Sequence, residues 1–62
     1  MKPYFAKSGA WVQFETLFPS GYHMVTLYDP EGEIHDRIRC DTYKGAQAYR
    51  RVFVAIAKNW GK

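Results

Sequence analysis

The chain has very little that could hold a small fold together covalently. Its 62 residues include one cysteine, Cys40, so no disulfide can form within the chain. The two histidines and the cysteine do not follow the spacing of a structural zinc site. A chain of this length buries only about 60% of the surface of its unfolded form. Stability must therefore come from a dense aromatic core or from a second copy of the chain, and the aromatic content of 18% suits either.

Long apolar runs are also missing. No stretch of 18 apolar residues occurs, so the sequence predicts no membrane span. The first residues, MKPYFAKSGAWV, have an early lysine but no apolar run of signal-peptide length, and export is not expected. An unpaired cysteine suits a reducing compartment. The sequence thus predicts a cytoplasmic protein with no membrane partner.

Side chains suited to catalysis are scarce. His23, His35 and Cys40 are the only candidates for nucleophile or base chemistry at neutral pH. His35 and Cys40 differ in strand parity, so an extended strand would point them to opposite faces. Neither a Gly-rich phosphate loop nor an H-E-x-x-H pattern occurs. We expect a protein that is not an enzyme, with no catalytic residue, no cofactor and no metal, and with Cys40 as a core thiol.

What the sequence does contain is a clear succession of strand and helix patterns. Runs rich in β-formers are separated by the turn signals PSG and DPEG, and the pattern then changes to a helical period that Asp41 or Thr42 can cap and Gly61 can stop. The predicted fold is α+β, a three-stranded antiparallel meander packed against one C-terminal helix (βββα), in a single domain, 1–62. Its predicted parts are a lead-in (1–9), three strands (10–18, 22–29 and 33–40) and a helix (42–59).

The alternation of residues along the strands predicts which face of the sheet is buried. If both hairpin loops hold an even number of residues, one face collects the apolar side chains: Val12, Phe14, Val25, Leu27, Ile34 and Ile38. A three-residue loop with a bulge at Gly32 would turn the second strand over and bury Tyr22, Met24 and Tyr28 instead. We prefer the first register.

The helix has an apolar side and a basic side. The stripe predicted to be buried is Tyr49, Val52, Phe53, Ile56 and Trp60, extended by Gly45 and Ala46. The basic stripe on the opposite side is Lys44, Arg51 and Lys58, with Val54 near it and expected to be exposed. Asp36 in the third strand points toward the core face, where it would guard an edge strand or pair with Arg50.

The other face of the sheet carries the candidate binding residues. Aromatic, hydrogen-bonding and guanidinium groups are interleaved there: Trp11, Gln13, Tyr22, Met24, Thr26, Tyr28, His35, Arg37 and Arg39. Arginine can bind guanine edges or phosphates, and aromatic rings can stack on unpaired bases. A polar sheet face is usually only solvated, but apolar side chains gathered over several hundred Å² usually mark a contact site.

Charge leaves the partner open. The net charge of +3 permits a nucleic-acid partner. However, Arg37 and Arg39 point away from the basic stripe of the helix, whereas nucleic-acid binders usually gather their basic residues on one side. Aromatic residues, methionine and arginine are also enriched at protein–protein interfaces. We therefore expect a small basic binding module that binds DNA or RNA, and the alternative is a protein-interaction module, a homodimer or a small adaptor or inhibitor, that uses the same face.

Residues 10–58 resemble the three-strand-plus-helix DNA-binding domains of integrase amino-termini and of AP2-type factors. The matching features are Gly21-Tyr22, Tyr28-Asp29 at a strand end, the Gly32-Glu33 turn, and Asp41-Thr42 before an Ala-rich helix with Tyr49. The spacing from Thr42 to Tyr49 departs from the AP2 pattern by one residue. In those families the sheet lies in the DNA major groove, so the resemblance implies DNA contacts by Gln13, Thr26, Arg37 and Arg39.

Overall fold

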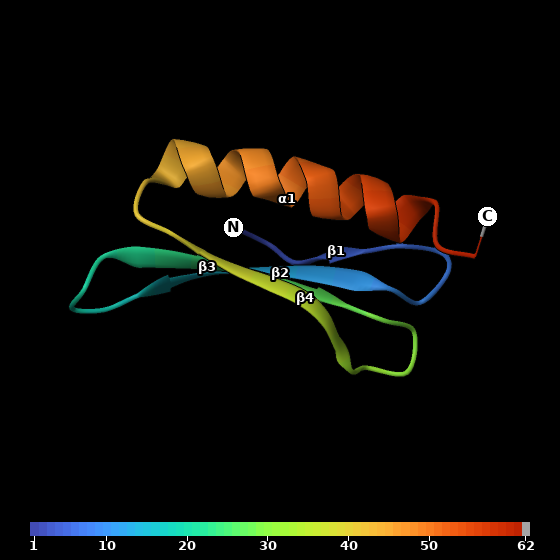
Figure 1. Cartoon of the computed structure of the whole chain (residues 1–62). Helices are drawn as coiled ribbons and strands as arrows, with labels where there is room; N and C mark the ends of the chain where they lie inside the picture. The colour runs from blue at the N-terminus through green and yellow to red at the C-terminus, as the bar shows by residue number, and fades with distance from the viewer. Residues whose placement is uncertain (62) are drawn as a thin grey trace.

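The computed structural model describes residues 1–61 and shows one helix lying on one face of an antiparallel sheet (Figure 1). The elements are β1 (Tyr4–Phe5), β2 (Trp11–Leu17), β3 (Tyr22–Tyr28), β4 (Ile34–Cys40) and α1 (Tyr43–Lys58). The four strands follow the order β1-β2-β3-β4, so each lies beside its neighbour in sequence. The α+β class, the antiparallel meander and the C-terminal helix are confirmed, and the count of three strands is wrong.

The strand missing from the prediction, β1, lies inside the segment that the sequence pattern marks as a lead-in. Tyr4 pairs with Val12 and Phe5 with Trp11. The turn to β2 is closed by the Ala6 amide, which donates to the Ala10 carbonyl at 2.9 Å. A two-residue strand is too short to show the alternation by which strands are recognised in a sequence.

The helix begins and ends within one residue of its predicted bounds. Thr42, rather than Asp41, is the N-cap, because its hydroxyl oxygen accepts a hydrogen bond from the Gly45 amide at 3.1 Å. At the other end Asn59 is the C-cap. Gly61 follows with a φ of 80°, a left-handed conformation that glycine adopts without strain.

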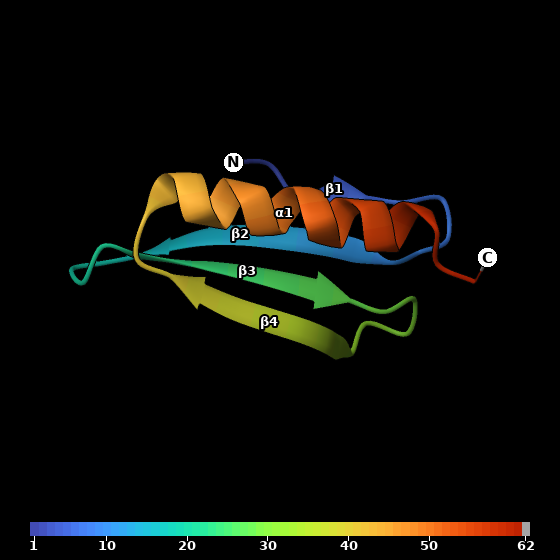
Figure 2. The same ribbon diagram turned by 45° about the horizontal axis from the view of Figure 1, so that its top comes forward.

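The preferred register of the hairpins is confirmed over most of the sheet. Val12 stands opposite Leu27, and Val25 lies between Phe14 and Ile38. The helix lies over β3 and β2 and packs less against β4 (Figure 2). Beneath it is the apolar core: Ala10, Val12, Phe14, Val25, Leu27, Cys40, Ala46, Phe53 and Ala57.

At the start of β4, a β-bulge makes the register differ from the predicted one. Leu27 pairs with Asp36, but Tyr28 pairs with Ile34, so His35 is an extra residue. Ile34, predicted to lie in the core, is 51% exposed and shares the face of Tyr28. His35, predicted on the outer face, instead meets Trp60 beyond the helix, with ring centroids 4.7 Å apart.

The helix is rotated about its axis relative to the predicted stripe. Its buried residues are Ala46, Phe53 and Ala57. Three residues predicted to be buried are instead exposed: Tyr49 by 43%, Val52 by 54% and Ile56 by 38%. Val54, predicted to be exposed, is half-buried and packs against the core.

Two hydrogen bonds join the rotated helix to the segment around β1. The Ser8 hydroxyl donates to the Ala57 carbonyl at 3.1 Å, and Arg50 Nη2 donates to the Lys2 carbonyl at 3.4 Å. The side of α1 that carries Arg50 and Ala57 therefore faces the chain on either side of β1. Arg50 therefore does not pair with Asp36, whose carboxylate accepts a hydrogen bond from the Arg37 amide at 2.8 Å.

Candidate binding face of the sheet

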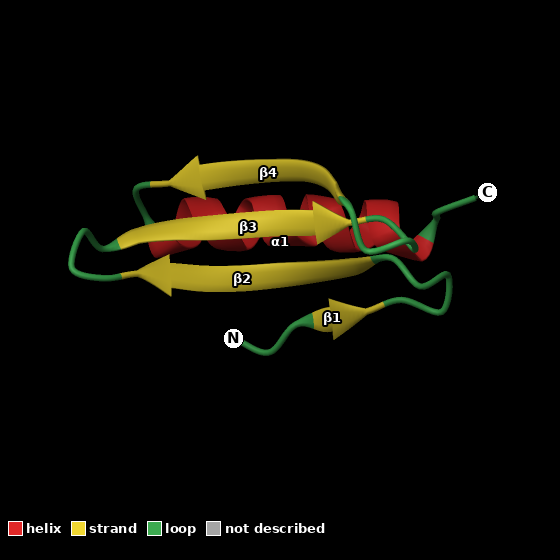
Figure 3. Ribbon diagram, turned by 90° about the horizontal axis from the view of Figure 1, so that it is seen from below, coloured by secondary structure: helices red, strands yellow, loops and turns green. Residues whose placement is uncertain are grey.

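The face of the sheet opposite α1 is turned away from every other element of residues 1–61 (Figure 3). We call it the outer face. Strand pairing arranges its side chains in rows that cross the strands. The rows are Phe5, Trp11, Tyr28 and Ile34; then Gln13, Thr26 and Arg37; then Glu15, Met24 and Arg39; and finally Leu17 and Tyr22.

Three aromatic rings stack across the sheet, and we call Phe5, Trp11 and Tyr28 the aromatic row. The centroids of Phe5 and Trp11 are 5.5 Å apart with 20° between the planes, and those of Trp11 and Tyr28 are 4.1 Å apart with 9° between them. The Tyr28 hydroxyl donates to Gln13 Oε1 at 3.2 Å. Trp11 is thus covered on both ring faces, whereas Phe5, at the end of the row, is 67% exposed.

Arg37 is anchored by a buried hydroxyl. Its Nε donates to Thr26 Oγ1 at 3.1 Å, and Thr26 has no exposed surface. Thr26 therefore supports Arg37 from below and offers no surface of its own to a partner. Arg37 itself is exposed, and its two terminal guanidinium nitrogens can serve as donors to a ligand.

Arg39 is held by an aromatic ring on the neighbouring strand. Its guanidinium carbon lies 4.6 Å from the centroid of Tyr22, which is a cation–π contact. Met24 lies between Arg39 and Glu15 in the row, so the Glu15 carboxylate is two strands away from the Arg39 guanidinium. Both arginines therefore reach solvent at the β4 edge of the outer face.

Sequence reasoning placed most of this face correctly and missed two of its members. Trp11, Gln13, Tyr22, Met24 and Tyr28 share it with both arginines and the buried Thr26, and only His35 lies elsewhere. Phe5 and Ile34 are additional. Strand alternation would have identified Phe5 only if β1 had been recognised, and the bulge that exposes Ile34 leaves no signature in the sequence.

The predicted basic stripe lies in the other layer of the molecule. Lys44, Arg51 and Lys58 are all exposed on α1. Lys58 Nζ lies 5.9 Å from the centroid of the Tyr4 ring, which places this end of the stripe beside β1. The basic stripe and the two arginines of β4 are therefore on different faces of the molecule.

Other functional groups of the described chain form no evident site. Within residues 1–61, no group of three or more histidine, cysteine or acidic side chains could hold a metal ion. His23 bonds to the Thr16 hydroxyl, with 3.0 Å between Nδ1 and Oγ1, and Cys40 is a buried free thiol. In this same part of the chain, no helix is long and apolar enough to cross a membrane.

The chain matches no protein-family model, and no curated protein or solved structure is significantly similar to it. The resemblance to integrase and AP2-type DNA-binding domains stays a prediction. Function has to be inferred from the geometry of the outer face.

Proposed function

We propose that the protein is a non-enzymatic nucleic-acid-binding module that binds through the outer face of its sheet. The observation that carries this proposal is the anchoring of two neighbouring guanidinium groups, Arg37 on the Thr26 hydroxyl and Arg39 on the Tyr22 ring. An arginine that is already held in place loses less side-chain freedom when it binds a phosphate.

The two arginines are spaced to contact one nucleic-acid backbone. They are two residues apart on β4, which is about 7 Å along a strand, and they point to the same face. Each can donate two hydrogen bonds to phosphate oxygens. The nearest carboxylate in their rows, Glu15, is beyond Met24, so it offers little repulsion to a backbone that follows the β4 edge.

The aromatic row favours a single strand over a duplex. Trp11 has a ring stacked on each side, so an incoming base cannot lie on it. Phe5 has one open ring face at the end of the row, and only an unpaired base can stack there. We therefore expect single-stranded DNA or RNA to bind more tightly than a duplex of the same sequence.

Fluorescence anisotropy with labelled mixed-sequence single strands and duplexes tests the proposal. The informative variant is Arg37→Ala/Arg39→Ala, and its control is Lys44→Ala/Arg51→Ala, which removes the same charge from the other layer. We expect the first variant to lose most binding at low salt and the second to lose little. The slope of log affinity against log salt should also fall by about 0.7 for each phosphate that is no longer neutralised. If the unaltered protein binds neither single strands nor duplexes at low salt, the proposal is wrong.

A second candidate function is a protein interface on the same face. It is favoured by the continuity of the first row, in which Phe5, Trp11, Tyr28 and Ile34 cross all four strands. Tryptophan, tyrosine and arginine are the residues that dominate binding energy at interfaces. The partner would be a second copy of the chain or a larger protein.

Size-exclusion chromatography with light scattering separates the two functions in one experiment. The protein is run alone and with a labelled single strand. A dimer that becomes a monomer on Trp11→Ala or Tyr28→Ala supports the protein interface. A monomer that co-elutes with the single strand supports nucleic-acid binding.

A further inference from the structure

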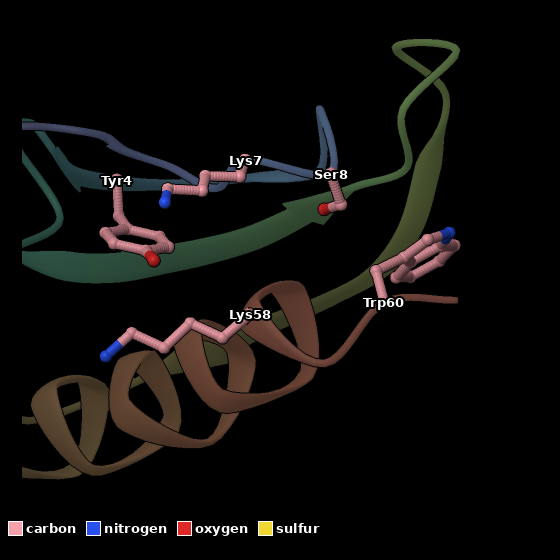
Figure 4. Close-up of a pocket in the computed structure, with 5 residues that line it drawn as sticks. All are labelled: Tyr4, Lys7, Ser8, Lys58 and Trp60. Carbon is pink, nitrogen blue, oxygen red and sulfur yellow. The ribbon is translucent and has the colours of Figure 1, made fainter. Parts of the chain in front are cut away.

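A basic cleft lies on the helix side of the molecule, between the β1–β2 turn and the C-terminal end of α1. It has a volume of about 540 Å³ and is lined by Tyr4, Lys7, Ser8, Lys58 and Trp60 (Figure 4). That volume is within the range of roughly 300–1,000 Å³ in which ligand sites fall. The residues of the outer face take no part in it.

The cleft concentrates positive charge. Lys7 and Lys58 come from opposite walls, lie on either side of the Tyr4 ring and extend in the same direction (Figure 4). Among the described residues no acidic side chain lines the cleft, and Lys58 Nζ lies over the aromatic face of Tyr4 rather than beside a carboxylate. Two ammonium groups with six donor hydrogens between them favour an anion with several acceptor oxygens, which describes a phosphate group.

The two walls of the cleft are fixed to each other. The Ser8 hydroxyl donates to the Ala57 carbonyl of α1 at 3.1 Å and accepts from the Ala10 amide at 3.3 Å. At the far end, Trp60 is held edge-on against His35. The separation of the walls is therefore set by bonds between sheet and helix, and not by the rotamers of the two lysines.

The cleft and the aromatic row are separated only by the edge strand. Tyr4 and Phe5 are consecutive residues of β1, so their side chains point to opposite faces. Phe5 ends the aromatic row on the outer face, and Tyr4 lines the cleft on the other. A chain that leaves the outer face at Phe5 and rounds the β1 edge arrives between Lys7 and Lys58.

We propose that this cleft binds a phosphate group, and that the phosphate belongs to the same single strand that crosses the outer face. The strand would pass from Arg37 on β4 across the sheet to Phe5 and then around β1 into the cleft. This inference rests on the proposed function. It also assigns a binding role to Lys7 and Lys58, which lie on a different face of the molecule from Arg37 and Arg39.

The test compares long and short single strands on matched variants. Lys7→Gln/Lys58→Gln removes the charge of the cleft, and Lys2→Gln/Lys44→Gln removes the same charge from exposed lysines outside it. Circular dichroism melts check that both variants fold. We expect the cleft variant to weaken binding of a 15-nucleotide strand about tenfold at low salt, to lower its salt slope by about 0.7 per phosphate released, and to leave a trinucleotide unaffected. The control should change neither.

Three results would overturn the inference and differ in what they leave standing. If the cleft variant behaves as the control while Arg37→Ala/Arg39→Ala still abolishes binding, the outer face binds nucleic acid without the cleft. If a mononucleotide shifts the amide signal of Ser8 and the indole signal of Trp60 in NMR spectra but the 15-mer affinity is unchanged in the cleft variant, the cleft is a site for a free phosphate monoester. If the unaltered protein binds no strand of any length, the proposed function fails together with the inference.

Discussion

The hydroxyl of Thr26, a side chain with no exposed surface, accepts a hydrogen bond from Arg37 Nε at 3.1 Å. A polar group in such a position is stabilised when it has a partner, and here the partner is an exposed cation. The bond links the interior of the sheet to the surface proposed to bind nucleic acid. It separates two roles: Arg37 contacts the ligand, and Thr26 positions Arg37.

The first prediction follows from that division of roles. Thr26→Val keeps the shape of the side chain and removes the anchor, so Arg37 regains rotamer freedom that binding must then restrict again. At about 0.5–1.5 kcal/mol per immobilised side chain, affinity for a single strand should fall about 2- to 10-fold, which is less than for Arg37→Ala. Anisotropy titration measures it. The control is Thr16→Val, the same change at a residue that does not face the ligand, and equal effects of the two valines would contradict the anchor.

The second prediction concerns the stacked rings of Trp11 and Tyr28. Stacked aromatic pairs contribute about 0.5–1.5 kcal/mol beyond the burial of their surface. A double-mutant cycle with Trp11→Ala and Tyr28→Ala, followed by urea unfolding, should show a coupling free energy of this size. Tyr28→Phe serves as the control, because it removes the bond to Gln13 and keeps the ring. Strictly additive losses would mean that the two rings are adjacent without stabilising each other.

The third prediction tests the rotation of the helix with two neighbouring residues. Phe53 is 4% exposed and Val52 is 54% exposed. Phe53→Ala should cost about 3–5 kcal/mol through the cavity that it leaves, which is comparable to the whole stability of a chain of this length. Val52→Ala should change the free energy of unfolding by no more than about 0.5 kcal/mol. Chemical denaturation measures the free energy of unfolding of both variants. Similar losses of stability would mean that Val52 and Phe53 are both buried, as the sequence predicted.

The fourth prediction concerns the open edge of the sheet at β4. The Asp36 carboxylate accepts the Arg37 amide, and a charge on an edge strand discourages pairing with another chain. Asp36→Val removes both effects, so we expect oligomers that grow with protein concentration in light scattering. Asp41→Val is the matched control, because Asp41 lies after the strand. If both variants stay monomeric, Asp36 does not protect the edge.

The elements with long, regular patterns could be predicted from the sequence. Alternation along β2 and β3 correctly assigned Val12, Val25 and Leu27 to the core and left Trp11 and Tyr28 outside. The cap at Thr42 was one of two predicted, because hydroxyl and carboxylate side chains both suit that position. For the strand faces, the residue type and its spacing are sufficient without knowledge of the rest of the chain.

What could not be predicted depends on contacts between distant parts of the chain. The bulge at His35 puts Ile34 and His35 on the opposite faces from those predicted, and no residue type in this part of the sequence indicates it. The helix is bonded to Lys2 and Ser8, on either side of β1, and a two-residue strand shows no alternation from which these contacts could be predicted. The same holds for the candidate site: alternation placed Arg37 and Thr26 on one face, but only the structure shows that one of them lies beneath the other.

The order of the strands bears on how the chain reaches its native state. Each strand pairs with its neighbour in sequence, so the sheet can assemble by closing short loops, which carry a low entropic cost and favour rapid folding. The bond from Ser8 to Ala57 is one exception, since it joins residues 49 positions apart. This bond joins the turn after β1 to the last turn of α1. We expect loss of the Ser8–Ala57 bond to accelerate unfolding more than it slows folding.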